Sequence, residues 1–539
     1  MSNRAVRACE GCRVRKVKCS NGLPCTQCSH LHLRCSYKGT IAPRGPAVRN
    51  RLVEQLREFQ NNLAIADASS KAALSFENGG SLVPGKDNRS KDEGTPFYSL
   101  LVPQNSQWTK KFFIELLDRY EEQVYPVNPI ITRQEIRAAI DCMHKDLDEG
   151  ALVYAFAAVT INLTTPTPWT AHGEIGVQMT ELMQQSLKAY RMAEMLRDWE
   201  RSRFCEVNLT FKRIMTCVFL EISMMAFNRF DRSLSVLREA QTMVQILHVQ
   251  QASHGATPLE GSELARFQRL YWEVFIHERF LTTLSGYPCV MHPLPSGLPV
   301  SDHSIPAHVD IGFNRLIRLF QLMDGPFLAY WRAQQNPSEP VQGISAEWIE
   351  MKQAQLDQDE REAAEAEGML LGAGVGPFTE LQHVDLFVTR LWLRTLLWQF
   401  GLTHGFLRST PPKNSHEGLS IHFPTHRLSV QLRDLVSRLD SVASIVTHGS
   451  GILAKLFEIT STVADVLALP LGYGQSQDDV RTRIEDFTYL VKFLFSFERV
   501  EKDQRDYLRE KLEVLRHQYT AADFGDIGKA SPPEPVKPM

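Results

Sequence analysis

The chain has 539 residues, of which 43% are hydrophobic and 22% are charged, and its net charge is −3. A single hydrophobic core stops growing at about 250–300 residues, so this length predicts at least two structural units, and the composition excludes a chain that is disordered throughout. The charge is unevenly distributed, because residues 1–60 hold twelve lysines and arginines and three acidic residues, a net charge of +9, and the other residues hold 47 basic and 59 acidic side chains. This asymmetry predicts an N-terminal segment that binds a polyanion.

The sequence has no feature of a secreted or membrane protein. The N-terminus is basic and polar and lacks the apolar segment of a signal peptide. The longest apolar stretch, residues 151–163, is shorter than the roughly 20 residues of a membrane-spanning helix, so we expect a buried helix there and no membrane partner. Four isolated cysteines have apolar neighbours and are expected in the core: Cys142, Cys205, Cys217 and Cys289.

Six of the ten cysteines fall within 27 residues near the N-terminus. In a reducing compartment such a cluster binds metal more often than it forms disulfides. The cluster repeats a motif in which two cysteines separated by two residues precede a third: Cys9, Cys12, Cys19, Cys25, Cys28 and Cys35. Three thiolates leave a tetrahedral zinc ion one ligand short. If two cysteines each bridge both ions, six thiolates complete two zinc sites. Two separate sites completed by His30 and His32, and a metal-storage peptide, are the alternatives.

Segment 8–37 resembles the DNA-binding domain of the fungal binuclear zinc-cluster (Zn2Cys6) transcription factors. The cysteine spacing, the basic run RVRKVK after the second cysteine and Pro24 carry this resemblance. It implies that Cys9 and Cys25 bridge two zinc ions, and that the other ligands are Cys12 and Cys19 for one ion and Cys28 and Cys35 for the other. It also implies a nuclear regulator of genes transcribed by RNA polymerase II, which works with the transcription machinery and is not an enzyme.

The basic run predicts the contacts with double-stranded DNA. A short helix that starts at the first two cysteines would project residues 13–18 away from the metal, and zinc-cluster modules place such a helix in the major groove. The resemblance implies that Lys16 contacts guanine O6 and N7, with Arg15 beside it, in a CGG-like half-site. The other contacts are expected to be with phosphates: Arg13, Lys18, Lys38, Arg44 and Arg49. The alternative function is a zinc-stabilised protein-interaction module without a specific DNA site.

Three segments follow the zinc-cluster domain, which is expected to occupy residues 1–38. Residues 39–50 are rich in proline, glycine and positive charge and predict a basic linker that lies along the DNA backbone. Residues 51–67 carry apolar residues at alternating four- and three-residue spacing, which favours a short coiled coil and a homodimer; a single helix docked on the rest of the chain is the alternative. Residues 68–104 are polar, glycine-rich and aperiodic, so we expect a disordered linker.

Residues 105–520 are expected to form a large all-α domain, the body. Apolar residues recur at helical spacing in 235–249 and 266–286, and Gly286 ends the second segment as a helix stop signal. Together with residues 120–136, these segments resemble the fungal-specific regulatory domain that follows many zinc clusters. Within that family the resemblance is to regulators of sugar use and of secondary-metabolite gene clusters.

Two features interrupt the helical pattern of the body. An acidic stretch that leads into glycines predicts an insertion loop at residues 353–377. Three histidines further along are the nearest candidates for an enzyme site: His416, His422 and His426. Because Pro424 is expected to break the helix that would place the last two on one face, they predict surface histidines in a loop and no metalloenzyme.

The last segment, residues 521–539, mixes acidic and apolar side chains in a polar stretch rich in proline. This composition predicts a disordered tail. It is equally compatible with a short activation segment that binds the transcription machinery.

Overall fold

The computed structural model describes only part of the chain. The described residues are Ser20, 108–165, 172–200, 206–252, 259–335, 343–374, 377–410, 413–439, Ile445, 449–469, 477–497 and 499–519. All of them except Ser20 belong to the second of two compact units, Gly94–Met539. The basic linker, the possible coiled coil, the linker at 68–104 and the tail lie outside the described residues, so what the sequence predicts for them stays a prediction.

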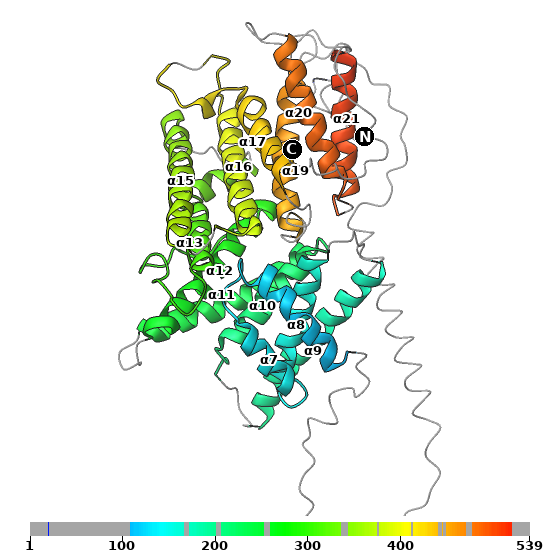
Figure 1. The fold of residues 1–539 in the computed structure, drawn as a ribbon, viewed down its shortest axis with the longest axis vertical. Helices are drawn as coiled ribbons and strands as arrows, with labels where there is room; N and C mark the ends of the chain where they lie inside the picture. The colour runs from blue at the N-terminus through cyan, green and yellow to red at the C-terminus, as the bar shows by residue number, and fades with distance from the viewer. Residues whose placement is uncertain are drawn as a thin grey trace, which may run out of the picture. The chain divides into compact units, whose positions relative to one another are not determined.

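Helices make up the described part of the body, which contains no strand, as the sequence predicts (Figure 1). In chain order they are α5 (Lys110–Glu115), α6 (Leu117–Arg119), η1 (Tyr120–Val124), α7 (Arg133–Cys142), α8 (Leu147–Thr164), α9 (Glu174–Glu200), α10 (Phe211–Met225), α11 (Phe230–Ala252), α12 (Gly261–Ser285), α13 (Ala307–Gln321), α14 (Gly325–Gln335), α15 (Ala346–Gly372), α16 (Glu380–Thr403), η2 (Glu417–Leu419), η3 (Pro424–Leu428), α17 (Ser429–Arg438), α19 (Gly449–Leu467), α20 (Gln477–Phe495) and α21 (Lys502–Gln518).

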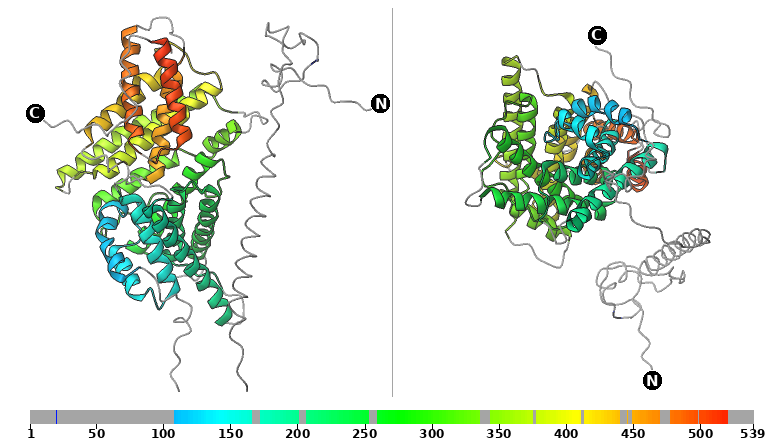
Figure 2. Two further views of the ribbon diagram at one scale, coloured as in Figure 1. Left: turned by 90° about the vertical axis from the view of Figure 1, so that its right-hand side faces the viewer. Right: turned by 90° about the horizontal axis from the view of Figure 1, so that it is seen from below.

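The helices form two groups that share one hydrophobic core. The N-terminal group consists of the helices from α5 to α12, and the C-terminal group of those from α13 to α21. Figures 1 and 2 show the first helices, blue to cyan, at one end of the body and the last helices, orange to red, at the other. Helix α12 packs on α10 and α11 of the first group and on α13 of the second. Helix α8 lies at the centre of the first group, against α7, α9 and α10.

Three helices predicted from the apolar residues of the sequence are confirmed. Every residue from Gly150 to Thr165 is buried, as expected of a helix that is apolar on all sides. Helix α12 ends at Gly286, whose φ of 72° is in the left-handed region that glycine adopts without a Cβ clash. The predicted apolar face of α11 is buried in full: Val236, Ala240, Met243 and Leu247.

The insertion loop predicted at 353–377 is wrong, because residues 346–372 form the single helix α15. Ser345 caps its N-terminus by accepting a hydrogen bond from the backbone N–H of Trp348. Some of the apolar side chains of α15 are buried, among them Ile349, Leu356 and Leu370. The stretch therefore forms a helix with one buried face, which its acidic composition alone does not indicate.

Arginines from neighbouring helices neutralise the acidic side chains of α15. Asp359 lies between Arg315 of α13 and Arg390 of α16, and Arg390 donates to it through Nε and Nη2 at 2.9 and 2.8 Å. A second set joins Asp357 and Glu360 to Arg394. Because these arginines lie 31 to 44 residues from their partners, no local pattern could predict the pairing.

The isolated cysteines differ in their surroundings. Cys217 is buried, as predicted, and Cys289 is half-buried, and burial raises the pKa of each thiol to about 12. Cys142 is exposed, contrary to the prediction, because it is the last residue of α7 and lies off the buried face formed by Ile136 and Ile140. Cys205 lies outside the described residues.

Candidate functional site

The predicted zinc and DNA sites lie in the undescribed N-terminal segment. This is true of the zinc ligands Cys9, Cys12, Cys19, Cys25, Cys28 and Cys35, and of the DNA contacts Arg13, Arg15, Lys16, Lys18, Lys38, Arg44 and Arg49. Their donor chemistry fits zinc, because closely spaced thiolates are the ligands of structural zinc sites. Among the described residues, no group of three or more His, Cys, Asp or Glu side chains could hold a metal ion. No described helix is long and apolar enough to cross a membrane.

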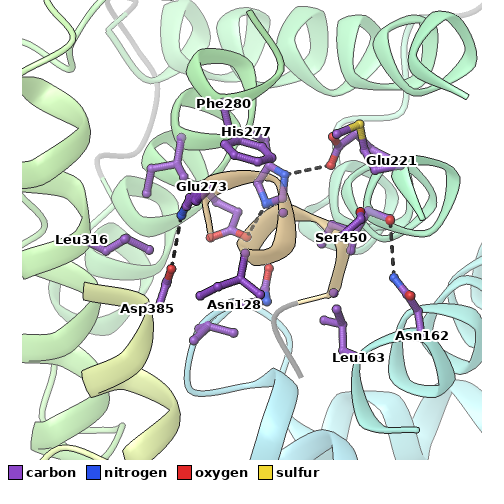
Figure 3. Close-up of a pocket in the computed structure, with 18 of the residues that line it drawn as sticks. Asn128, Asn162, Leu163, Glu221, Glu273, His277, Phe280, Leu316, Asp385 and Ser450 are labelled. Atoms are coloured by element: carbon purple, nitrogen blue, oxygen red, sulfur yellow. Dashed lines mark hydrogen bonds and ion pairs between the residues drawn. The ribbon is translucent and has the colours of Figure 1, made fainter. Parts of the chain in front are cut away.

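A cavity of about 140 Å³ in the described body lies where the two helix groups meet (Figure 3). Its walls come from the turn after η1 and from α8, α10, α12, α13, α16 and the start of α19. Most of the lining is apolar, including Met225, Phe280, Leu316 and Phe320. An apolar pocket with a few converging polar groups is the usual form of a small-molecule site.

One polar cluster of the cavity is a histidine held between two glutamates. His277 of α12 lies with Nδ1 2.7 Å from Glu221 of α10 and with Nε2 3.3 Å from Glu273 of its own helix. Burial alone would lower the pKa of His277, but the charges and hydrogen bonds of the two carboxylates outweigh burial and raise the pKa to about 10. Burial raises the pKa of Glu273. At neutral pH the protonated imidazole therefore bonds to both carboxylates.

The second polar cluster is centred on Lys455 of α19. Its Nζ donates to Thr389 Oγ1 at 2.7 Å and lies 3.4 Å from a carboxylate oxygen of Asp385. Burial lowers the pKa of Lys455, and the charge of Asp385 opposes this effect. Three aromatic rings surround the ammonium group, with centroids 5.4, 5.6 and 5.7 Å away: Phe280, Phe320 and Trp392.

Helix α19 enters the cavity wall through the sequence Gly449-Ser450-Gly451. Gly449 has a φ of 65°, and a Cβ atom there would lie 2.9 Å from Leu163 of α8. A Cβ atom at Gly451 would lie 3.3 Å from the ring of Phe280. The two glycines therefore let the start of α19 approach α8 and α12, and Ser450 presents the one side chain between them.

The protonated state of His277 predicts a pH-dependent stability. Because the folded pKa of about 10 exceeds the unbonded value of 6.5, the stabilisation is complete below pH 6.5 and is lost as pH rises to about 10. The free energy of unfolding should fall in this range by up to about 1.4 kcal/mol per pH unit.

Urea unfolding of wild type and His277→Gln should show a difference in the free energy of unfolding that is largest near neutral pH and shrinks toward pH 10. A difference that stays constant with pH contradicts the assignment. Asp385 and Lys455 face the site in both proteins, and the difference reports the charge of His277 together with its effect on the glutamates that it pairs with.

Sequence reasoning missed this cavity. Its polar residues are spread from Asn128 to Lys455, so no motif contains them. The available signal was charge inside apolar helical segments, as at Glu221 in α10 and at Glu273 and His277, one turn apart in α12. Such residues are rarely buried without a partner.

The three histidines singled out in the sequence do not form one site. His416 lies outside the helices, as predicted, but it is half-buried rather than on the surface; it caps η2, and its Nε2 lies 2.9 Å from Asp357. His426 is exposed, as predicted, but it lies in the helical segment η3 and not in a loop. Pro424 does not break a helix; it begins η3, which leads into α17, because a first helical position needs no N–H donor. The rings of His422 and His426 lie 5.8 Å apart, and His426 is 3.4 Å from Asp479.

Comparison with known proteins identifies the N-terminal segment. Residues 7–42 match the family model of the fungal Zn(2)-Cys(6) binuclear cluster domain. The chain carries a fungal zinc-cluster domain. This match confirms the resemblance that the cysteine spacing and the basic run predict, and the zinc-cluster domain implies that the chain binds zinc.

The similarity to known proteins extends beyond the zinc-cluster domain. The chain is 21% identical to "Probable sucrose utilization protein SUC1" of Candida albicans, over 86% of this chain and 79% of that protein. It is 21% identical to "Maltose fermentation regulatory protein MAL13" of Saccharomyces cerevisiae, over 93% of this chain and 91% of that protein. A stretch of 73 residues is 34% identical to "Maltose fermentation regulatory protein MAL63" of Saccharomyces cerevisiae, and it covers 12% of this chain and 15% of that protein.

Proposed function

We propose that this protein is a nuclear, sequence-specific DNA-binding transcription factor that regulates genes of sugar use. The observation that carries this proposal is the zinc-cluster domain at residues 7–42. The net charge of +9 on residues 1–60 suits a domain that binds DNA. Two similar proteins are named for sucrose utilization and maltose fermentation, and none of the three named proteins concerns secondary metabolism, so the proposal is confined to sugar use.

We assign the DNA and zinc contacts to the N-terminal segment. Two zinc ions are held by the six clustered cysteines, of which Cys9 and Cys25 bridge both ions. Zinc fixes the loops of residues 1–38 where few apolar side chains exist to do so. Lys16 and Arg15 read a CGG-like half-site of a gene transcribed by RNA polymerase II, and the linker at 39–50 follows the phosphates. Residues 51–67 pair two chains, and residues 105–520 regulate, with no enzymatic step.

The proposal predicts opposite signatures for a base contact and a phosphate contact. Lys16→Ala should cost about 1–3 kcal/mol of binding free energy on the preferred site and little on random DNA, because it removes hydrogen bonds to base edges. Arg49→Ala should weaken binding to all duplexes alike and make the slope of log K against log salt shallower by about one unit. Fluorescence anisotropy of the full-length protein on both duplexes, over a salt series, measures both effects.

The two variants control for each other, because each removes one positive charge. If both lowered affinity equally on specific and random DNA, the basic run would be a nonspecific electrostatic patch. A wild-type protein that bound DNA without sequence preference would favour the alternative, a zinc-stabilised protein-interaction module.

A further inference from the structure

The cavity described above differs from an ordinary packing defect because charged side chains line it. Its lining contains three carboxylates, on Glu221, Glu273 and Asp385, and two cationic groups, on His277 and Lys455. Glu221, Glu273 and Lys455 are nearly inaccessible to solvent. Burying charge costs free energy unless the groups are paired, and a core filled with apolar side chains would be at least as stable. The retained charges therefore point to a ligand.

We propose that this cavity binds a small, neutral, hydroxyl-rich molecule, with one sugar ring as the unit that fills it. The proposal deepens the proposed function, and it rests on that function where it makes the ligand the effector of a regulator of sugar genes. The binding chemistry itself is argued from the cavity alone.

The size of the cavity sets the first limit on the ligand. Its volume of about 140 Å³ is close to that of an apolar protein cavity of about 150 Å³ that holds one benzene molecule. The six ring atoms of one sugar therefore fit inside, while the hydroxyl groups, which double the number of non-hydrogen atoms, must reach the polar walls and the opening of the cavity. A second ring of a disaccharide would have to extend through the opening of the cavity.

The walls match the two kinds of surface on a sugar ring. The rings of Phe280 and Phe320, with Leu316, offer apolar area for the C–H faces. Carboxylate oxygens of Asp385 and Glu273 accept hydrogen bonds from hydroxyl groups, and hydrogen bonds to charged groups are stronger than those between neutral groups. Figure 3 shows these polar groups around a common space, with Asn128 on one side and His277 on the other.

The charges of the cavity decide against an anionic ligand. His277 is already paired with two glutamates, and Lys455 with Asp385. A phosphate or carboxylate would therefore approach three carboxylates without a cation reserved for it, and like charges in a poorly solvated site repel strongly. A neutral polyol forms hydrogen bonds to the same groups and adds no charge.

A ligand in this position would connect the two helix groups. It would contact Glu221 and Phe280 of the first group and Asp385 and Ser450 of the second. A ligand that binds only the arrangement with both walls in place stabilises that arrangement by mass action. Binding would thus bias how the two groups pack, which is a physical means for an effector to regulate the protein.

The test is calorimetric titration of the purified, zinc-loaded, full-length protein with glucose, fructose, maltose and sucrose. The comparison ligands are putrescine, a diamine, and citrate, a carboxylate. We expect saturable binding of at least one sugar and none of either comparison ligand. Absence of sugar binding, or binding of putrescine or citrate in its place, overturns the proposal.

A plug variant, in which a larger side chain fills the cavity, tests whether the sugar binds there. Ser450→Phe places a ring in the open space and should raise the Kd of the bound sugar about tenfold or more, which corresponds to the loss of about 1.4 kcal/mol. Ser437→Phe, on the exposed surface of α17, is the matched control and should bind like wild type. If Ser450→Phe does not fold, Ser450→Leu is a smaller plug. Unchanged affinity in a folded plug variant overturns the assignment.

DNA binding by the same preparations separates this inference from the proposed function. A protein that reads its DNA site and binds no sugar would leave the proposed function intact and remove the inference. A protein that binds sugar in the cavity and has no DNA preference would do the opposite.

Discussion

Removal of zinc should unfold the N-terminal domain and abolish specific DNA binding, while the helical body stays folded. Residues 1–38 contain few apolar side chains, so metal binding must supply most of their folding free energy, for which about 10–16 kcal/mol is typical of small structural zinc sites. The body has its own continuous hydrophobic core. Chelation followed by circular dichroism should therefore show little loss of helical signal, while binding to a CGG-containing duplex disappears.

Elemental analysis tests the shared-ligand arrangement directly. The full-length protein should contain two zinc ions per chain. Cys25→Ser, which removes a proposed bridging thiolate, should lose both ions because each depends on that ligand. Cys142→Ser is the control, since this exposed cysteine on α7 should leave zinc content and DNA binding unchanged. One ion per wild-type chain, or one or two ions retained in Cys25→Ser, would rule out the bridged cluster.

Asp359→Asn should destabilise the body by about 3–5 kcal/mol, because it leaves the buried Arg390 without its counter-charge and removes one of the two carboxylates that pair with Arg315. Asp359 binds both Arg315 and Arg390, and all three side chains are less than 10% exposed. The asparagine oxygen can still accept the hydrogen bonds of Arg390, but the arginine is left in a poorly solvated site without a negative charge. The measurement is the urea midpoint of the body, followed by helical circular dichroism.

Glu362→Gln provides a control on the same helix. Glu362 also pairs with Arg315, at 2.8 Å, but its side chain is 34% exposed. Exposed ion pairs contribute about 0–1 kcal/mol, so the control should remain close to wild type. Replacing Asp359, Arg315 and Arg390 together by leucine should recover much of the lost stability, because no unpaired buried charge remains. Equal destabilisation by Asp359→Asn and Glu362→Gln would show that burial does not govern the network.

Several parts of this protein were predictable because their determinants lie close together in the chain. The zinc-cluster domain follows from six cysteines within 27 residues, since the ligand spacing around a metal is a local property. Helix α8 follows from a continuous apolar stretch and helix α12 from apolar periodicity, and Gly286 marks the end of α12. The failed predictions also have a physical cause. The acidic stretch of α15 predicts an insertion loop when it is considered alone, because the arginines that neutralise Asp359 lie on α13 and α16.

The sequence by itself determined the zinc-binding N-terminal segment, the basic run beside it and the helical nature of the body. Tertiary structure alone decided which charges are buried and where a cavity remains. Asn128, Glu221, His277 and Asp385 come from four parts of the chain, and Lys455 from a fifth. They meet because α12 packs on both helix groups and the glycines at the start of α19 allow a close approach. Hydrophobic periodicity specifies which face of a helix is buried, but the partner that covers that face depends on the packing of the whole core.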